Sequence, residues 1–506
     1  MWKKTAKEEA SDYMNLFRRD APWSRAATHV RVFKTLTQFL TFASDEQLRQ
    51  MFADLRQRQI ALAVEALMQT GTGGCGWGVE GYSAPNAMES LALRVKRLGG
   101  VLNYVAMDEP LWFGHRYSGP HACRSSIAAV ANDVARKAAA IRRVFPNVQV
   151  GDIEPYAVPG QPGDWLDEIA QWIAIYRAAT GENLAFLDTD MDWHVNWRPQ
   201  LAALVPVLKA TGIKFGIIYN GDAGDTTGLT WTRHAEEHFV AVESDPTLVP
   251  DQAILQTWMR HPSRNLPESQ PGTMTWLVNR YAAAPTRLTL QRVGDRLEGQ
   301  LTGPVGKPLA GQRVQVLALD ANNAGPPADR TLSDTVPEGA VSALFILRIN
   351  AECGCSGPVN VTLGPLRYRD DRTGQEIVRT FAVPGSVRTA AGTHIVAAAG
   401  RKFVPNSPPW KVTPGDKWTI HVPMGAAEDS THSGYVALLF LRKDRREVSR
   451  IPLPFEPATQ PLGEVTTDTT GRFALAPSAS VVRLNPGFRV EFAGSDSYRL
   501  SIAAVR

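Results

Sequence analysis

Two adjacent carboxylates close a short apolar stretch of the chain, residues 101–110 (VLNYVAMDEP). An apolar run that ends at a proline predicts a strand buried on both faces. Asp108 and Glu109 then stand where this strand leaves the core. Because successive side chains of a strand point to opposite faces, we expect only one of the two carboxylates to face a site.

Carboxylates also end other apolar runs in the first half of the chain. Two carboxyl groups can cleave a glycosidic bond, because one protonates the leaving oxygen while the other attacks or activates water. Close carboxylates also raise one another's pKa, which keeps one of them protonated near neutral pH. The catalytic candidates are Glu109, Glu154, Asp188 and Asp190.

Aromatic and polar residues are interleaved with these acids, as a carbohydrate site requires. Sugars have apolar C–H faces that stack on aromatic rings, and hydroxyls that bond to carboxylates, amides and guanidinium groups. The predicted substrate-binding residues are Glu65, Asp108, Trp112, His115, Trp193, His194, Tyr219, Asn220, Trp258, Arg260, Trp276 and Asn279. Each aromatic residue taken alone fits a core position equally well. Asp188, Asp190 and Asp192 would share one face, but the rest of a calcium loop is missing. We therefore expect no metal and no cofactor.

A strand–helix alternation positions these residues. The predicted strands are residues 29–34, 60–65, 101–109, 148–154, 183–188, 214–219, 253–258 and 273–278. One predicted helix begins at a capping box, Ser44–Gln47. The other predicted helices cover residues 85–98, 125–145, 164–180, 198–210 and 232–244. Eight strands in about 250 residues predict a (β/α)8 barrel, whose active site lies at the carboxyl ends of its strands. A doubly wound sheet is the alternative, although no Gly-x-Gly-x-x-Gly follows the first strand.

The pattern changes to short alternating segments after Tyr281, which predicts an all-β remainder. Residues 306–316 and the segment Thr467–Phe473 (TDTTGRF) resemble parts of transthyretin-like or immunoglobulin-like modules. We therefore expect three domains. They are the barrel over 1–284, a split sandwich over 285–325 and 459–506, and an inserted sandwich over 326–458 that is a candidate for carbohydrate binding. Two consecutive sandwiches are the alternative.

Composition excludes several other classes of protein. The 506 residues are 44% hydrophobic and 21% charged, with a formal net charge of +4. No block of Lys and Arg predicts a nucleic-acid partner, and no apolar run reaches the roughly 20 residues of a membrane span. The sequence does not predict an oligomeric state.

Cysteine placement bears on the compartment. Cys75 and Cys123 would follow neighbouring strands and are a candidate disulfide, whereas Cys353 and Cys355 lie in one loop; four free thiols are the alternative. The N-terminus lacks the apolar segment of a complete signal peptide. The accessory β modules and the candidate disulfide nevertheless favour a secreted or periplasmic location.

The barrel, the acid-rich strand ends and the appended sandwiches together resemble TIM-barrel glycoside hydrolases with accessory β domains. The resemblance implies cleavage of a poly- or oligosaccharide. In the largest clan of these enzymes the acid follows strand four and the nucleophile follows strand seven. Glu154 matches the first position, but residues 255–261 (LQTWMRH) contain no carboxylate. Two alternatives stay open: a glycan-binding or surface-assembly protein with a degenerate barrel, and a metal-dependent hydrolase. No His-x-His follows the first strand, as the latter usually requires.

Overall fold

The chain forms two compact units in a computed structural model. The described residues are 12–505 except 159, 223–224, 226, 320–327, 351–358, 390–391, 399–400, 427–433, 456–458, 479–480 and 482–486. The first unit comprises Met1–Trp193, Trp197–Gly221 and Thr227–Ala282, and the second comprises His194–Asn196, Asp222–Thr226 and Ala283–Arg506. Cys353 and Cys355 lie outside the described residues, as does most of the N-terminal segment judged for a signal peptide.

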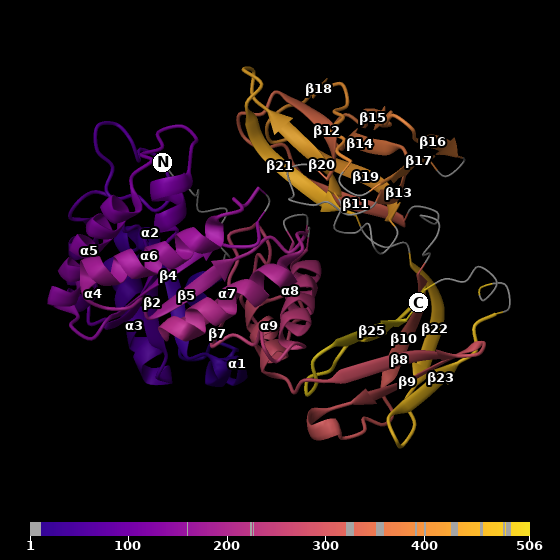
Figure 1. The fold of residues 1–506 in the computed structure, drawn as a ribbon, viewed down its shortest axis with the longest axis horizontal. Coiled ribbons are helices and arrows are strands. Elements are labelled where there is room, and N and C mark those ends of the chain that lie inside the picture. The colour runs from indigo at the N-terminus through magenta and orange to yellow at the C-terminus, as the bar shows by residue number, and fades with distance from the viewer. Residues whose placement is uncertain are drawn as a thin grey trace. The chain divides into compact units, whose positions relative to one another are not determined.

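A parallel sheet of seven strands forms the centre of the first unit (Figure 1). Its strands pair in sequence order: β1 Val32–Leu36, β2 Ala61–Ala66, β3 Leu102–Asp108, β4 Gln149–Pro155, β5 Phe186–Asp190, β6 Lys214–Tyr219 and β7 Gln252–Leu255. The sheet curls around an interior cluster made of Ala106, Ile153, Phe186 and Ile218. The predicted α/β barrel class is thus confirmed.

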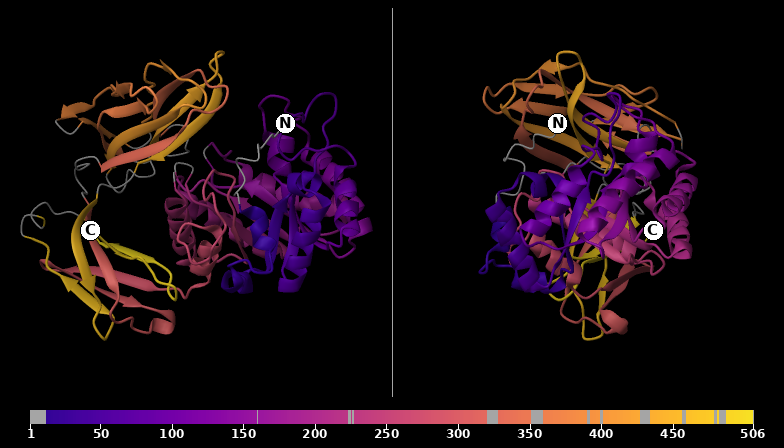
Figure 2. Two further views of the ribbon diagram at one scale, coloured as in Figure 1. Left: turned by 180° about the vertical axis from the view of Figure 1, so that it is seen from behind. Right: turned by 90° about the vertical axis from the view of Figure 1, so that its left-hand side faces the viewer.

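Helices cover the outer face of this sheet, as Figures 1 and 2 show. They are α1 Ser24–His29, α2 Thr37–Phe42, α3 Asp45–Arg58, α4 Ala87–Arg97, α5 Ile127–Val144, α6 Trp165–Thr180, α7 Trp197–Thr211, α8 Gly228–Glu243 and α9 Met274–Ala282, with short turns η1 Tyr13–Phe17 and η2 Trp112–Arg116. The capping box is present, since the Gln47 amide donates to the Ser44 hydroxyl and the Ser44 amide donates to the Gln47 side chain. None of the helices in the described part of the chain is long and apolar enough to cross a membrane.

The predicted eighth strand, residues 273–278, is wrong, because this segment lies in helix α9. Thr273, Thr275 and Leu277 are all buried. Burial of every second residue is also the pattern of a strand with one face in the core. The helix instead directs Arg280 inward, where its guanidinium lies 2.5 and 3.0 Å from the carboxylate of Glu236 in α8. Within the described residues, β1 and β7 therefore remain the two edges of the sheet.

The buried Arg280–Glu236 pair provides a test of how α9 is fixed. Glu236→Gln removes the carboxylate charge that lies against the guanidinium of Arg280, a residue only 5% exposed. We expect the free energy of unfolding to fall by about 3–5 kcal/mol, as measured by urea denaturation. Glu237→Gln is the matched control, because it breaks a surface pair with Arg233 and should cost less than about 1 kcal/mol. Equal losses in the two variants would contradict this account.

The second unit consists mainly of antiparallel strands in stacked sheets, consistent with β-sandwiches. Its strands are β8 Arg287–Val293, β9 Arg296–Thr302, β10 Arg313–Leu319, β11 Ala328–Thr335, β12 Ser342–Ile349, β13 Val359–Leu363, β14 Leu366–Asp370, β15 Glu376–Arg379, β16 Val387–Thr389, β17 Gly392–Ala397, β18 Trp410–Lys411, β19 Lys417–Ala426, β20 Gly434–Leu441, β21 Glu447–Pro454, β22 Thr459–Thr466, β23 Arg472–Leu475, β24 Gly487–Phe492 and β25 Ser501–Val505, with one short turn η3 Pro304–Gly306.

Strands from both ends of this unit share their sheets. β10 pairs with β22 on one side and with β24 on the other, and β9 pairs with β23. Leu301, Val316, Phe473 and Val490 belong to one buried cluster with other residues of these sheets. This pairing is the arrangement that a split sandwich requires, and we therefore propose the division into 285–325 with 459–506, and 326–458.

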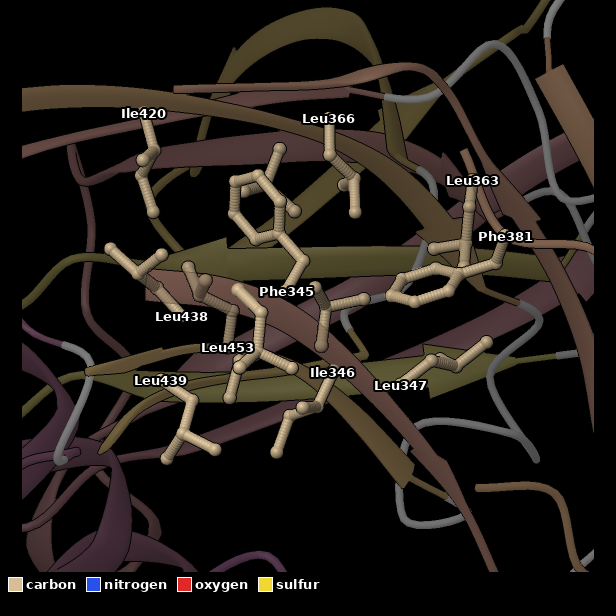
Figure 3. Close-up of a cluster of buried hydrophobic side chains, with 14 of the residues drawn as sticks. Phe345, Ile346, Leu347, Leu363, Leu366, Phe381, Ile420, Leu438, Leu439 and Leu453 are labelled. Carbon is tan, nitrogen blue, oxygen red and sulfur yellow. The ribbon is translucent and has the colours of Figure 1, made fainter. Parts of the chain in front are cut away.

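The middle strands pack around a separate core (Figure 3). Leu366 and Ile420 point from one sheet toward Phe345 of the facing sheet. Trp410 and Trp418 belong to this same core, with exposed fractions of 8% and 1%. Neither ring offers a face to a sugar, so these two tryptophans do not support carbohydrate binding by the middle strands.

Candidate active site

Carboxylates converge at the carboxyl ends of the barrel strands. Glu65 lies in β2, Asp108 and Asp190 end β3 and β5, and Glu109 follows Asp108 directly. All four residues are half-buried. They lie close enough for the charge of each to influence others in the set. We call these four, together with Glu80, the acid cluster.

Glu109 reaches the acid cluster because the chain turns sharply at this residue. Its φ of 47° lies in the left-handed region, which costs a non-glycine residue of order 1 kcal/mol or more. Its amide donates to the carbonyls of Met107 and Ile153, at 3.2 and 3.1 Å. The expectation that only one of Asp108 and Glu109 faces the site is therefore wrong, since strand alternation ends before Glu109.

Burial and like charge keep protons on this cluster. Desolvation raises the pKa of Glu109 well above its ordinary value, and the charge of Asp190 adds to the shift. The pKa of Asp190 rises to about 7, first through burial and then through Glu65, while Lys34 opposes the shift. Burial and Glu65 likewise raise the pKa of Asp108. The cluster therefore holds both protonated and ionised carboxyl groups near neutral pH.

Lys34 supplies a positive charge beside these acids. Its Nζ lies 2.9 Å from Glu65 Oε2 in an ion pair whose side chains are both 14% exposed. The side-chain amide of Gln256 donates to the same oxygen at 2.9 Å. These two contacts hold the Glu65 carboxyl group in place beside the other acids.

Glu80 belongs to the cluster although the sequence analysis did not select it. It lies in the loop between β2 and α4 and is exposed to solvent, and desolvation and the charge of Glu65 raise its pKa. The next residue, Gly81, has a φ of 78°, and a Cβ there would meet the carbonyl oxygen of Asp108 at 2.6 Å. The signal available in the sequence was a carboxylate inside a glycine-rich loop after a strand.

A disulfide fastens this loop. Cys75 and Cys123 are joined, as the candidate pairing proposed, and the Gly76 amide also donates to the His121 carbonyl at 2.7 Å. The bond links the loop that carries Glu80 to the loop that follows β3. It therefore restrains one wall of the acid cluster.

Asp188 lies deeper in the barrel, two residues before Asp190 on the same face of β5. It is only 3% exposed, and burial raises its pKa to about 7 while Lys34 lowers it. Gly216 of β6 makes room for it, because a Cβ at that position would lie 1.9 Å from Asp188 Oδ1. A catalytic role for Asp188 stays a prediction.

Glu154 binds backbone amides on the opposite side of β4 from the barrel interior, although the charge of Glu109 helps to raise its pKa, and its catalytic role stays a prediction. Both of its oxygens accept backbone amides, from Leu111 at 2.6 Å and Trp112 at 3.0 Å, and the residue is fully buried. The reason is strand alternation, since its neighbour Ile153 belongs to the barrel interior. Glu154 thus fastens the loop that follows Glu109. Asp152, on the same face, accepts from Trp172 of α6 at 2.6 Å.

Three predicted substrate-binding residues are instead packed in the barrel wall. Trp193 stacks on His238 with a centroid distance of 4.3 Å and donates to the Asn220 side chain at 2.5 Å. Tyr219 is completely buried, and Asn220 is 5% exposed. Buried rings cannot stack on a sugar, so the prediction for Trp193, Tyr219 and Asn220 is corrected.

The remaining predicted binding residues fall into several environments. Trp276 and Asn279 lie on α9 rather than at a strand end, and Asn279 donates to Glu268 at 3.2 Å. Trp258 packs against the barrel interior, while Arg260 is exposed. Their roles in binding stay predictions.

Two predicted residues lie in the η2 turn. The half-buried Trp112 contacts Trp165 edge-on at a centroid distance of 5.3 Å. His115 Nδ1 lies 2.6 Å from the Ser125 carbonyl.

In the second unit, His194 Nε2 lies 3.5 Å from Asp222 Oδ1. Among the described residues, no group of three or more His, Cys, Asp or Glu is arranged to hold a metal ion.

Comparisons with known proteins leave the family open. No protein-family model and no curated protein matches the sequence. Similar solved structures include a Cellulomonas fimi endo-β-1,4-mannanase (10% identity, 84% of this chain, 86% of that chain, TM-score 0.34). Others are an α-L-arabinofuranosidase from Thermotoga maritima (9%, 80% and 92%, TM-score 0.30) and a D-psicose 3-epimerase from Clostridium cellulolyticum H10 (12%, 41% and 78%, TM-score 0.26). At TM-scores below 0.5, these similarities carry no argument about activity.

The disulfide gives a test of the loop that carries Glu80. The double replacement of Cys75 and Cys123 by Ser removes a crosslink across 48 residues. We expect the free energy of unfolding to fall by about 2–4 kcal/mol in urea denaturation, because the unfolded chain gains freedom. A reducing agent should have the same effect on the unaltered protein and none on the double variant. Unchanged stability in both experiments would contradict a structural role.

Proposed function

We propose that the first unit is a glycoside hydrolase that cleaves a poly- or oligosaccharide at the carboxyl end of its barrel. The observation that carries the proposal is the acid cluster, in which carboxyl groups from β2, from the end of β3, from β5 and from the loop after β2 lie near one another and differ in their protonation near neutral pH. Glycoside hydrolysis needs this combination of a protonated acid and an ionised partner. The chemistry requires no metal or cofactor.

Glu109 and Asp190 are assigned the two roles. Asp190 has the most influence of any neighbouring charge on the pKa of Glu109, which supports their being close. Glu109, whose pKa is raised well above its ordinary value, donates a proton to the leaving oxygen. Asp190, ionised above pH 7, acts as the nucleophile or activates water. Glu65, Glu80 and Asp108 bind sugar hydroxyls around this pair.

Replacement of the two acids tests these roles. Glu109→Gln and Asp190→Asn should each lower kcat/KM by about 10²–10⁴ on the substrate found by screening glycans, as expected for loss of a positioned acid or base. Glu237→Gln, which changes a surface carboxylate of α8, should keep full activity. The loss in Glu109→Gln should shrink on aryl glycosides with acidic leaving groups, because these need little protonation.

Two outcomes would overturn the assignment. Full activity in both variants would remove Glu109 and Asp190 from the mechanism. Glycan binding without turnover by the unaltered protein, across a broad panel of polysaccharides and aryl glycosides, would favour the alternative of a glycan-binding protein.

The charge of Lys34 sets the expected pH dependence. Activity should fall as the pH drops through about 7, because Asp190 then becomes protonated. Lys34 holds the pKa of Asp190 down, so Lys34→Met should move this acidic limb to higher pH in a plot of kcat/KM. Lys209→Met, an exposed change on α7, should leave the profile in place. An unshifted limb in Lys34→Met would contradict Asp190 as the ionised group.

We also propose that the protein is exported. The Cys75–Cys123 disulfide supports this location, because such bonds persist in oxidising compartments and are rare in the cytosol. Polysaccharide substrates outside the cell would fit the same location.

A further inference from the structure

The open edge of the barrel encloses a cavity of about 770 Å³ in the first unit. It lies between β1 and β7, where a complete barrel would have its eighth strand. Residues of η1 and α9 form further walls, and side chains of the barrel interior line it. Cavities of roughly 300–1,000 Å³ are typical of sites for small molecules. We call this space the seam cavity.

Most of the seam cavity is apolar. Its lining includes Phe33, Tyr104, Phe186, Leu255 and Val278, which come from β1, β3, β5, β7 and α9. Contact with these side chains favours an apolar or aromatic body over water. A ligand that filled this part would gain free energy from the apolar surface that it removes from water.

Polar groups also line the cavity, and four of them, Lys34, Glu65, Asp188 and Gln256, bear on what it could bind. Lys34 and Glu65 neutralise each other in their ion pair. Asp188 Oδ1 and Gln256 Oε1 have no hydrogen-bond partner among the described residues, and both atoms are buried. The orientation of the Gln256 amide is fixed, because its nitrogen donates to Glu65.

Two buried acceptors without donors are unfavourable unless another molecule supplies the hydrogen bonds. The missing group is a hydrogen-bond donor that can reach one of these buried oxygens. A hydroxyl on an apolar molecule supplies such a donor.

We infer that the seam cavity binds one small molecule with an apolar body and a hydroxyl group that donates to Asp188 Oδ1. This cavity lies within the barrel, and Glu65 belongs both to its lining and to the acid cluster. The inference does not depend on the proposed hydrolase activity, because binding can be measured without turnover.

The probe for the test is 2-naphthol, with naphthalene as the matched compound that lacks the hydroxyl. Titration of the full chain at pH 6, followed by fluorescence, should show one saturable site for 2-naphthol. Its affinity should be at least about tenfold higher than that of naphthalene, which is the effect of one hydrogen bond to otherwise unsatisfied acceptors. No saturable binding of 2-naphthol, or equal affinity for both compounds, would overturn the inference.

Variants locate the binding site. Val278→Trp should reduce 2-naphthol affinity at least tenfold by filling the cavity, and Asp188→Ala should remove the preference for 2-naphthol over naphthalene. Val249→Trp is the control, because Val249 is 48% exposed and does not line the cavity. Unaltered binding in the first two variants would overturn the inference.

A crystal structure of the unaltered protein with 2-naphthol gives an answer that does not depend on the variants' folding. Ligand density beside Asp188 would support the site. Protein atoms or ordered water filling the cavity in the presence of 2-naphthol would overturn it.

Discussion

The rest of this structure depends on the free-energy cost of burying several carboxylates together at the carboxyl end of the barrel, which we call the barrel mouth. Ionised carboxylates lose hydration when they are buried, and their like charges repel one another. Lys34 offsets part of this cost, because its charge lowers the pKa of Asp108, Asp188 and Asp190. The mouth therefore keeps some of its acids protonated near neutral pH, and this is the property that the proposed chemistry uses.

The surrounding loops hold these acids where an unrestrained chain would separate them. Glu109 adopts a left-handed conformation, Glu154 binds the two amides that follow Pro110, and the Cys75–Cys123 bond restrains the loop of Glu80. Each device fixes backbone close to the acid cluster rather than the carboxyl groups themselves. Glu154 is therefore a positioning residue in the proposed mechanism, one step removed from the reacting atoms.

The incomplete closure of the barrel follows from a competition between two ways of burying the segment after β7. As helix α9, it brings the guanidinium of Arg280 onto the carboxylate of Glu236. The edges of β1 and β7 are then left apart, and the seam cavity lies between them.

The sequence by itself determined the strand order, most helices of the barrel and the acids at the strand ends, because apolar periodicity and caps such as Ser44–Gln47 are local signals. Only the tertiary structure decided that Glu154 points away from the mouth, that Glu109 turns into it, and that Glu80 joins it from a loop. It also decided that α9 replaces the eighth strand, through a partner 44 residues away in sequence. Such outcomes depend on which face a side chain takes where a strand ends and on contacts between residues distant in sequence. A local sequence pattern encodes neither.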